Sequence, residues 1–159
     1  MEPDMSQTPS AAERIEIERA CERLIYAYSR ALDLGDMSAA ADFFAANGSF
    51  ARPMAPDKVI QGREAIRAAL LTRPKTLLTK HLATNVMIDV VSREEAQGLS
   101  YLTMISTTPS GDAAAPYVSA GPVYFGEIVD RFVREGGEWR ILERRGSIQM
   151  KFFGAPAAG

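Results

Sequence analysis

The sequence contains very few of the side chains from which disulfides and metal sites are built. It has one cysteine, Cys21, and one histidine, His81, among 159 residues. A single cysteine excludes an intrachain disulfide, and a metal site would need ligands drawn almost wholly from carboxylates. We find no carboxylate cluster of that kind, and no phosphate-binding glycine loop or nucleophilic triad. We therefore expect an activity that needs no cofactor.

Long apolar runs and an excess of one charge are also absent. No apolar stretch approaches the ~20 residues of a membrane-spanning helix. The net charge of -2 comes from both signs mixed along the chain, so we expect neither nucleic acid nor a membrane as partner. Residues 1–10 lack the basic start and apolar core of a signal peptide, which predicts a disordered leader and a cytoplasmic protein.

The chain is long and apolar enough to form one domain with a substantial core. Hydrophobic residues make up 47% of it, and no internal repeat divides it. We predict a single domain over residues 11–153, followed by a flexible tail at 154–159.

The first third of this domain has a helical period. Apolar residues recur at spacings of three and four, at Ile17, Ala20, Cys21, Leu24, Ile25, Tyr28, Ala31 and Leu32. This pattern predicts a long amphipathic helix. Gly35 suits the positive φ at a helix end, and Asp36 is placed to cap a second helix over residues 38–46.

Shorter elements are expected next. Asn47-Gly48 predicts a turn into a broken hairpin with strands at 49–52 and 58–61, which prolines interrupt. A third helix is expected at 63–71, before Pro74.

From residue 77 onward the period changes to two. The alternation predicts strands at 79–91, 96–107, 122–134 and 139–148. Helices followed by long antiparallel strands indicate an α+β domain, in which a strongly curved, mixed, mainly antiparallel sheet wraps around three N-terminal helices and leaves a cavity between them.

The strand at 79–91 carries apolar residues on both faces. One face is predicted to hold His81, Ala83, Asn85, Met87 and Asp89, and the other Leu82, Thr84, Val86, Ile88 and Val90. An outward apolar face usually marks an interface, so we expect a homodimer or homotrimer built on the outer face of the sheet.

Asp33 and His81 are the first candidates for chemistry. Asp33 lies in the last turn of the first helix, where the unpaired carbonyls and the macrodipole oppose a negative charge. It is either a candidate base or a solvated acid in a turn. A lone histidine on a mixed strand face, taken by itself, is ordinarily a satisfied polar residue.

Three segments together resemble a known family: YSRALDLGD at 28–36, TKHLATN at 79–85 and GGEWRILER at 136–144. They resemble the SnoaL-like branch of the nuclear transport factor 2-like superfamily, over about residues 11–153. The resemblance implies a cone-shaped α+β barrel.

Within that branch the arrangement looks most like scytalone dehydratase, bile acid dehydratase and hexachlorocyclohexane dehydrochlorinase. There an aspartate at the end of the first helix and a histidine at the start of a long strand form a dyad, and Asp33 and His81 match them. Tyr28 matches a catalytic tyrosine, and Arg144 an arginine, of the bile acid enzyme. A second histidine and an acid near Met104 are lacking, so the substrates of those enzymes are not transferred.

The matched dyad implies general acid–base chemistry, because a carboxylate bonded to one imidazole nitrogen fixes the tautomer and raises the basicity of the other. We expect a cofactor-independent lyase, either a dehydratase or a C–C lyase, acting on a small hydrophobic, aromatic or alicyclic metabolite. The alternatives are an isomerase or cyclase using the same dyad, and a non-catalytic small-molecule-binding domain in which Asp33 and His81 are structural.

The other candidates each have two interpretations. Tyr28 is either core filler or a donor to a leaving oxygen, and Asn85 either a pocket residue or a structural one. Arg144 and Arg145 point to opposite faces of the last strand, so Arg144 either looks inward or forms an outward ion pair. A further set of apolar residues is either plain core or the lining of the cavity: Phe50, Met87, Tyr101, Met104 and Phe125.

Overall fold

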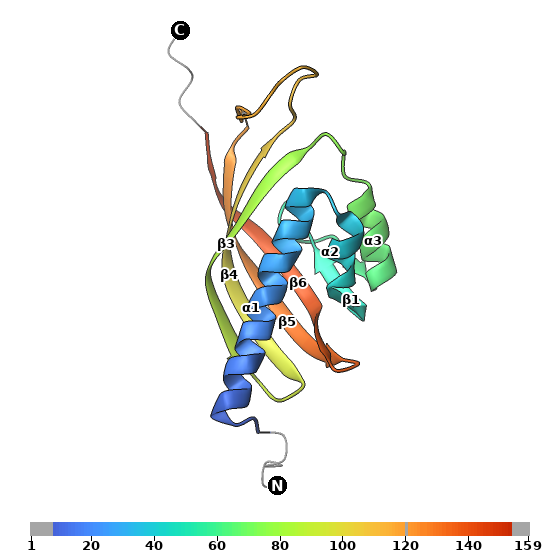
Figure 1. The fold of residues 1–159 in the computed structure, drawn as a ribbon, viewed down its shortest axis with the longest axis vertical. Coiled ribbons are helices and arrows are strands. Elements are labelled where there is room, and N and C mark those ends of the chain that lie inside the picture. Colours follow the sequence, from blue (N-terminus) through green and yellow to red (C-terminus); the bar gives the residue numbers. More distant parts are fainter. Residues whose placement is uncertain (1–7, 120, 154–159) are drawn as a thin grey trace.

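The computed structural model describes residues 8–119 and 121–153 of the chain (Figure 1). The expected leader therefore lies outside the described residues except for 8–10, and the expected tail at 154–159 lies outside them completely. Within the described parts of the chain, no helix has both the length and the apolar character needed to cross a membrane. The cellular location stays a prediction.

The first helix, α1 (Ala11–Leu34), has both of its ends fixed by local contacts. At its start, the Glu13 amide donates to Ser10 Oγ (3.3 Å) and the Ser10 amide donates to Glu13 Oε2 (2.7 Å), a reciprocal capping box. At its end Gly35 takes φ 78°, the left-handed conformation that glycine adopts without strain. The predicted helix and its glycine stop are confirmed.

The second helix, α2 (Met37–Asp42), is capped as expected but is shorter than predicted. Asp36 Oδ1 accepts a hydrogen bond from the Ala39 amide (2.9 Å). The following strand, β1 (Phe44–Ala51), begins well before the predicted turn at Asn47-Gly48.

In place of that turn, β1 continues through Asn47-Gly48 with a shift in its register against β6 between Phe44 and Ser49. Gln61 Nε2 donates to the Asn47 carbonyl (2.8 Å), and the Gly62 amide donates to the Gly48 carbonyl (2.7 Å). These contacts join β1 to β2 (Val59–Gln61), which pairs with it antiparallel, so the expected broken hairpin is present. The third helix, α3 (Arg63–Leu71), has the predicted bounds.

The remaining chain forms four long strands, β3 (Leu78–Val90), β4 (Glu95–Thr107), β5 (Val123–Glu135) and β6 (Glu138–Phe152). Together with β1 and β2 they make a six-stranded sheet in the order β2-β1-β6-β5-β4-β3. The pairing of β1 with β6 is parallel, and the other pairings in this sheet are antiparallel.

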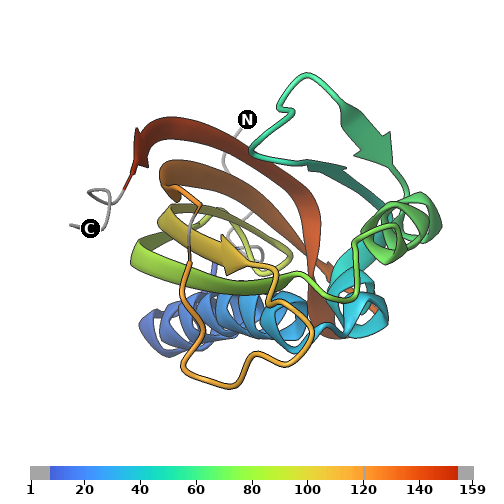
Figure 2. The same cartoon turned by 90° about the horizontal axis from the view of Figure 1, so that it is seen from above.

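The sheet is curved and unclosed, and α1 lies along its concave face (Figures 1 and 2). The helices α2 and α3 pack on each other beside β1 (Figure 1). This arrangement confirms the predicted α+β class and the mixed, mainly antiparallel sheet.

A β-bulge at Asn85 divides β3 into two parts. Thr84 pairs with Tyr101, but the next paired residue, Met87, lies opposite Leu99, so two residues of β3 face one of β4. Asn85 takes φ 50°. The inward face therefore passes from the odd-numbered residues before the bulge to the even-numbered residues after it.

The bulge corrects the prediction for the two faces of this strand. Val86, Ile88 and Val90 pack against the core instead of pointing outward, and Met87 is 64% exposed. The apolar outer face was predicted from the wrong residues, although Leu82 does lie outside and is 47% exposed.

Three aromatic rings pack at the junction of α1 with β1. Tyr28 contacts Phe44 and Phe50 edge to face, with ring centroids 5.7 and 6.4 Å away, and Phe44 lies 5.8 Å from Phe50. All three side chains are buried. This cluster joins the core to the cavity described next.

Candidate active site

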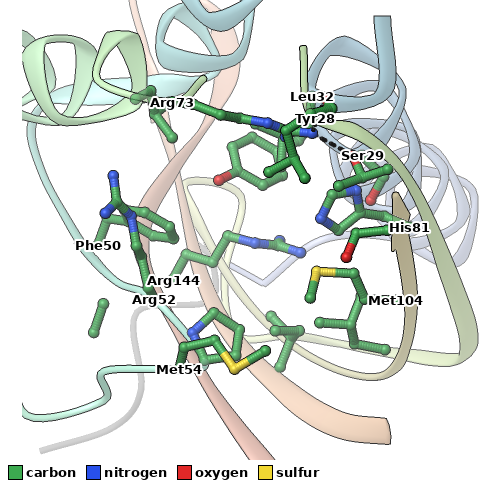
Figure 3. A pocket seen from close by; sticks show the side chains of 18 of the residues that line it. Tyr28, Ser29, Leu32, Phe50, Arg52, Met54, Arg73, His81, Met104 and Arg144 are labelled. Atoms are coloured by element: carbon green, nitrogen blue, oxygen red, sulfur yellow. Dashed lines mark hydrogen bonds between the residues drawn. The ribbon is translucent and has the colours of Figure 1, made fainter. Parts of the chain in front are cut away.

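A cavity of about 350 Å³ lies at the C-terminal end of α1. Its wall is formed by α1, by β1 and the residues after it, by the end of α3 and its following loop, and by β3 to β6 (Figure 3). Apolar residues supply much of it: Tyr28, Leu32, Phe50, Met54, Leu70, Leu77, Leu102, Met104, Ile128 and Ile148. Its size and composition suit a small hydrophobic molecule.

Asp33 and His81 are in direct contact at one side of this cavity. Asp33 lies in the last turn of α1, and His81 on the first part of β3 points toward the helix. His81 Nδ1 lies 2.6 Å from Asp33 Oδ1, and the His81 amide donates to Asp33 Oδ2 (3.0 Å). Their side chains are only 12% and 13% exposed. His81 lines the cavity, and the carboxylate supports the imidazole from behind.

The geometry fixes the tautomer of the neutral imidazole, with its proton on Nδ1. A carboxylate only accepts hydrogen bonds, so the short contact places the proton on Nδ1 and leaves the Nε2 lone pair available. Burial lowers the pKa of His81 below its ordinary 6.5; the contact with Asp33 opposes this shift, and the charges of Arg73 and Arg144 add to it. His81 is therefore suited to accept a proton near neutral pH.

Thr79 holds the Asp33 carboxylate directly and Arg73 holds Thr79, and neither residue was among the candidates predicted from the sequence. Arg73 Nη2 donates to Thr79 Oγ1 (2.6 Å), and Thr79 Oγ1 donates to Asp33 Oδ1 (3.0 Å). Arg73 Nη2 also lies 3.3 Å from the Leu77 carbonyl. Thr79 lies two residues before His81 on the same strand, so the alternation of side chains could have placed it on the same face. Arg73 lies in a loop, where residue spacing does not predict the direction of a side chain.

Tyr28 lies both in the core and at the cavity, the two positions that the sequence left open for it. Its ring packs in the aromatic cluster, and its hydroxyl points into the cavity (Figure 3). Burial raises its pKa to about 12, so the phenol stays protonated at neutral pH. Within the described residues the hydroxyl makes no hydrogen bond to protein, and it is therefore free to donate to a ligand.

Arg144 lies inward and pairs with an acid that the sequence analysis missed. Arg144 Nη1 donates to Asp130 Oδ2 (2.8 Å), and the guanidinium carbon lies 4.7 Å from the centroid of the Tyr28 ring. Both side chains of the pair are buried. The outward alternative is thus wrong for Arg144, while Arg145 is exposed and pairs with Glu143.

Asp130 is completely buried on β5, and burial raises its pKa to about 6 against the opposing effect of Arg144. Its Oδ1 finds no donor among the described residues. A signal was present in the sequence, because Asp130 has the same strand parity as the buried Ile128 and Phe132.

Of the residues predicted to line the cavity, the structure places Phe50 and Met104 there. The other four are corrections, because each points away from it. Asn85 is exposed in the bulge, and Met87 faces outward as a consequence. Tyr101 pairs with Thr84, and Phe125 pairs with Thr103, on the outer face of the sheet.

Comparison with known proteins identifies the class and then the family. The fold is that of the nuclear transport factor 2-like superfamily. The model of the SnoaL-like domain matches residues 13–145, most of the chain, and the chain therefore belongs to that family. A comparison with curated proteins finds no match.

Solved structures show the same fold at low sequence identity. A putative scytalone dehydratase from Novosphingobium aromaticivorans is 23% identical, covering 94% of this chain and 95% of that chain, with a TM-score of 0.76. A type 2 hexachlorocyclohexane dehydrochlorinase is 14% identical, covering 94% and 100%, with a TM-score of 0.72. A protein from Catenulispora acidiphila in complex with S-DNPA is 22% identical, covering 84% and 94%, with a TM-score of 0.66.

The described residues offer no candidate metal site. Across residues 8–119 and 121–153, no group of three or more His, Cys, Asp or Glu side chains is arranged to hold an ion. The cavity lining includes the imidazole of His81 and the phenol of Tyr28.

Proposed function

We propose that the protein is a cofactor-independent lyase, a dehydratase or a C–C lyase, acting on a small hydrophobic, aromatic or alicyclic metabolite. The observation that carries this proposal is the 2.6 Å contact between Asp33 and the imidazole of His81 at the wall of a largely apolar cavity. The family membership supports it. So do the similar structures, since two of them are described as a putative dehydratase and a dehydrochlorinase.

In a dehydration, His81 Nε2 takes a proton from a substrate carbon, and the electron pair of that C–H bond forms the new double bond. The adjacent C–O bond breaks, and Tyr28 gives its phenolic proton to the departing oxygen, which leaves as water. Asp33 stabilises the imidazolium that forms. The imidazolium then gives up its extra proton, and the Tyr28 phenolate takes up a proton through solvent, so both groups return to their starting states.

A C–C lyase would use the same groups in another order. His81 would take the proton of a substrate hydroxyl, and the electron pair left on that oxygen would form a carbonyl double bond as the neighbouring C–C bond breaks. The carbon that keeps the electron pair of the broken bond would take a proton from the Tyr28 hydroxyl, and the imidazolium would return a proton to Tyr28. Arg144, whose guanidinium points into the cavity, would stabilise negative charge on the substrate oxygen in either reaction (Figure 3).

The experiment begins with identifying the ligand that copurifies with the protein by mass spectrometry of the denatured extract. That compound and its close analogues are then incubated with the protein in deuterated water. A lyase yields a smaller product plus water or a carbon fragment. An isomer carrying deuterium at a new position would indicate the isomerase alternative, and unchanged ligand would indicate the binding-domain alternative.

We also propose a homodimer or homotrimer, in which a second copy of the chain covers the outer face of the sheet. Met87 of β3, Leu99 of β4 and Val129 of β5 lie in register on three adjacent strands, and all are at least 40% exposed. Leu82 and Tyr101 extend the same apolar surface. Sedimentation at micromolar concentration tests this, and a species of monomer mass would contradict it.

A further inference from the structure

The charges around the cavity do not balance. Three arginines line it, Arg52, Arg73 and Arg144, and no acid of the described chain does. The positive charges of two of these arginines have carboxylates close to them, just outside the cavity lining. Arg144 pairs directly with Asp130, and Arg73 reaches Asp33 through the Thr79 hydroxyl.

Arg52 has no such counter-charge. Among residues 8–119 and 121–153, no carboxylate comes within 4.0 Å of its guanidinium. Its recorded hydrogen bond runs from Nη2 to the Ala69 carbonyl in α3 (2.6 Å). A guanidinium has five N–H donors, so most of its capacity remains for a ligand.

The backbone beside Arg52 is held by the packing of the next residue, whereas the Arg52 side chain is exposed. Arg52 follows the end of β1, and the next residue, Pro53, lies close against β6: a Cβ placed on Gly146 would stand 2.5 Å from Pro53 Cγ. The Ala69 carbonyl then anchors the guanidinium at the C-terminal end of α3. This hydrogen bond restricts the exposed side chain before any anion binds, which lowers the entropy cost of binding.

Arg52 and His81 lie on different sides of the cavity, with the Tyr28 hydroxyl and Arg144 between them (Figure 3). The charge of Arg52 is close enough to favour the ionised form of the Tyr28 phenol, as those of Arg73 and Arg144 also do. One end of the cavity is therefore suited to proton transfer, and the other offers an uncompensated positive charge beside the apolar ring of Phe50.

We infer that the substrate is a hydrophobic acid, whose carboxylate binds Arg52 while its apolar body extends across the cavity toward His81. This inference rests on the proposed function in treating the bound acid as a substrate, but binding of the anion itself does not depend on turnover. A carboxylate would supply the one negative charge that the cavity wall lacks, and its two oxygens match the planar fork of a guanidinium.

The alternative explanation for Arg52 is structural. An arginine near a helix C-terminus satisfies orphan carbonyls and interacts favourably with the helix dipole. In that case Arg52 would stabilise α3 without affecting which ligands bind, so ligand discrimination has to be measured together with stability.

The test compares two probes of nearly the same shape, 2-naphthoate and 2-naphthamide, by isothermal titration calorimetry at pH 7 and low salt. We expect the wild-type protein to bind the naphthoate at least about tenfold more tightly, as hydrogen bonds to a charged group predict. In Arg52→Gln that preference should disappear while naphthamide binding stays. Arg23→Gln, at an exposed position on α1 outside the cavity wall, is the matched control and should keep it.

His81→Ala separates this inference from the proposed function, because it should lose turnover but keep the preference for the naphthoate. Thermal unfolding of Arg52→Gln measures the structural contribution independently. Equal binding of the two probes by the wild type, binding of neither, or a preference that persists in Arg52→Gln would overturn the inference and leave the lyase proposal standing.

Discussion

Among the described residues, Asp33 pairs with His81 in a largely buried position and Asp130 pairs with Arg144 in a fully buried one, and the hydrogen bonds of the two acids differ. Both oxygens of Asp33 have partners, since Oδ1 contacts the Thr79 hydroxyl and the imidazole while Oδ2 accepts from the His81 amide. Asp130 has one partner for one oxygen, and its Oδ1 has none in the described structure. The first acid is held in one orientation, and the second mainly supplies charge.

The difference extends to what each pair can do. The partner of Asp33 is an imidazole that can gain or lose a proton near neutral pH, whereas a guanidinium keeps its charge throughout. We therefore expect changes at the first pair to appear in activity, and changes of Asp130, which does not line the cavity, to appear mainly in stability. The predictions below test that division.

The largest effect is expected from His81→Ala. Loss of the general base should lower kcat by ~10²–10⁴-fold on the identified substrate. Asp33→Asn should lower it nearly as much, because it keeps the volume and removes the orienting charge. Asp36→Asn is the matched control, since asparagine also caps helices, and it should behave as wild type. Wild-type turnover by either dyad variant, measured with circular dichroism as a check of folding, would favour the binding-domain alternative.

Asp130→Asn should instead act on stability. It leaves the Arg144 charge buried without its counter-ion, and breaking a buried pair in this way costs up to about 3–5 kcal/mol in the free energy of unfolding. Burial of the carboxylate charge is itself unfavourable and raises the pKa of Asp130, so its removal offsets part of that cost. Urea titration measures this, with Glu143→Gln as control, since its partners Arg131 and Arg145 are exposed and the expected change is about 1 kcal/mol or less. If both variants lose the same small amount, the buried pair is not the stabilising element we describe.

The same pair should make stability depend on pH. The pKa of Asp130 is raised to about 6 in the folded chain from an ordinary 3.8, so the folded state binds a proton first as the pH falls. This stabilisation is fully present below about 3.8 and is lost as the pH rises through about 6. The free-energy difference between wild type and Asp130→Asn should accordingly be larger at pH 5 than at pH 7, and an unchanged difference would contradict the assignment.

Thr79→Val should produce a smaller loss in activity. It removes the hydroxyl that links Arg73 to Asp33 but leaves both contacts between Asp33 and His81. One hydrogen bond of this kind predicts a fall of roughly 3- to 10-fold in kcat, with little change in KM. Thr84→Val is a suitable control because Thr84 is exposed on the same strand. A change confined to KM would indicate that Thr79 acts on substrate binding instead.

The smallest effect concerns the pH dependence of the rate. His81 works as a base when neutral, so kcat/KM should decline as the pH falls through its lowered pKa, below the ordinary 6.5. The charge of Arg73 helps to lower that pKa, so Arg73→Gln should move the acid limb to higher pH. Arg73→Lys keeps the charge and should leave the limb near its wild-type position. Coincident limbs in all three proteins would remove Arg73 from this role.

Much of the fold could be predicted because its signals are local. The apolar stripe of α1, the glycine that ends it and the bounds of α3 depend on residues within a few positions of each other. The approach of Asp33 to His81 was predicted differently, from the family resemblance, because it joins residues 48 positions apart.

The missed features depend on geometry that is not local. A period of two assumes an unbroken strand, so the bulge at Asn85 reversed the predicted faces of Val86, Met87 and Ile88. The pair Asp130–Arg144 depends on the register of β5 with β6, which itself contains irregularities. Arg52 and Arg73 stand at the end of a strand and in a loop, where neither spacing nor parity indicates direction.

The bulge at Asn85 also divides β3 into two phases, in which residues of opposite parity face inward. Thr79 and His81 before it line the cavity, and the even-numbered residues after it pack against the core, so the two parts of one strand contribute to different interiors. Substitutions that reshape the cavity can accumulate in one phase without disturbing packing in the other. Deleting the single residue Asn85 would remove the bulge and join the two phases, because Val86 would then stand opposite Ser100 and the side chains beyond it would keep their faces.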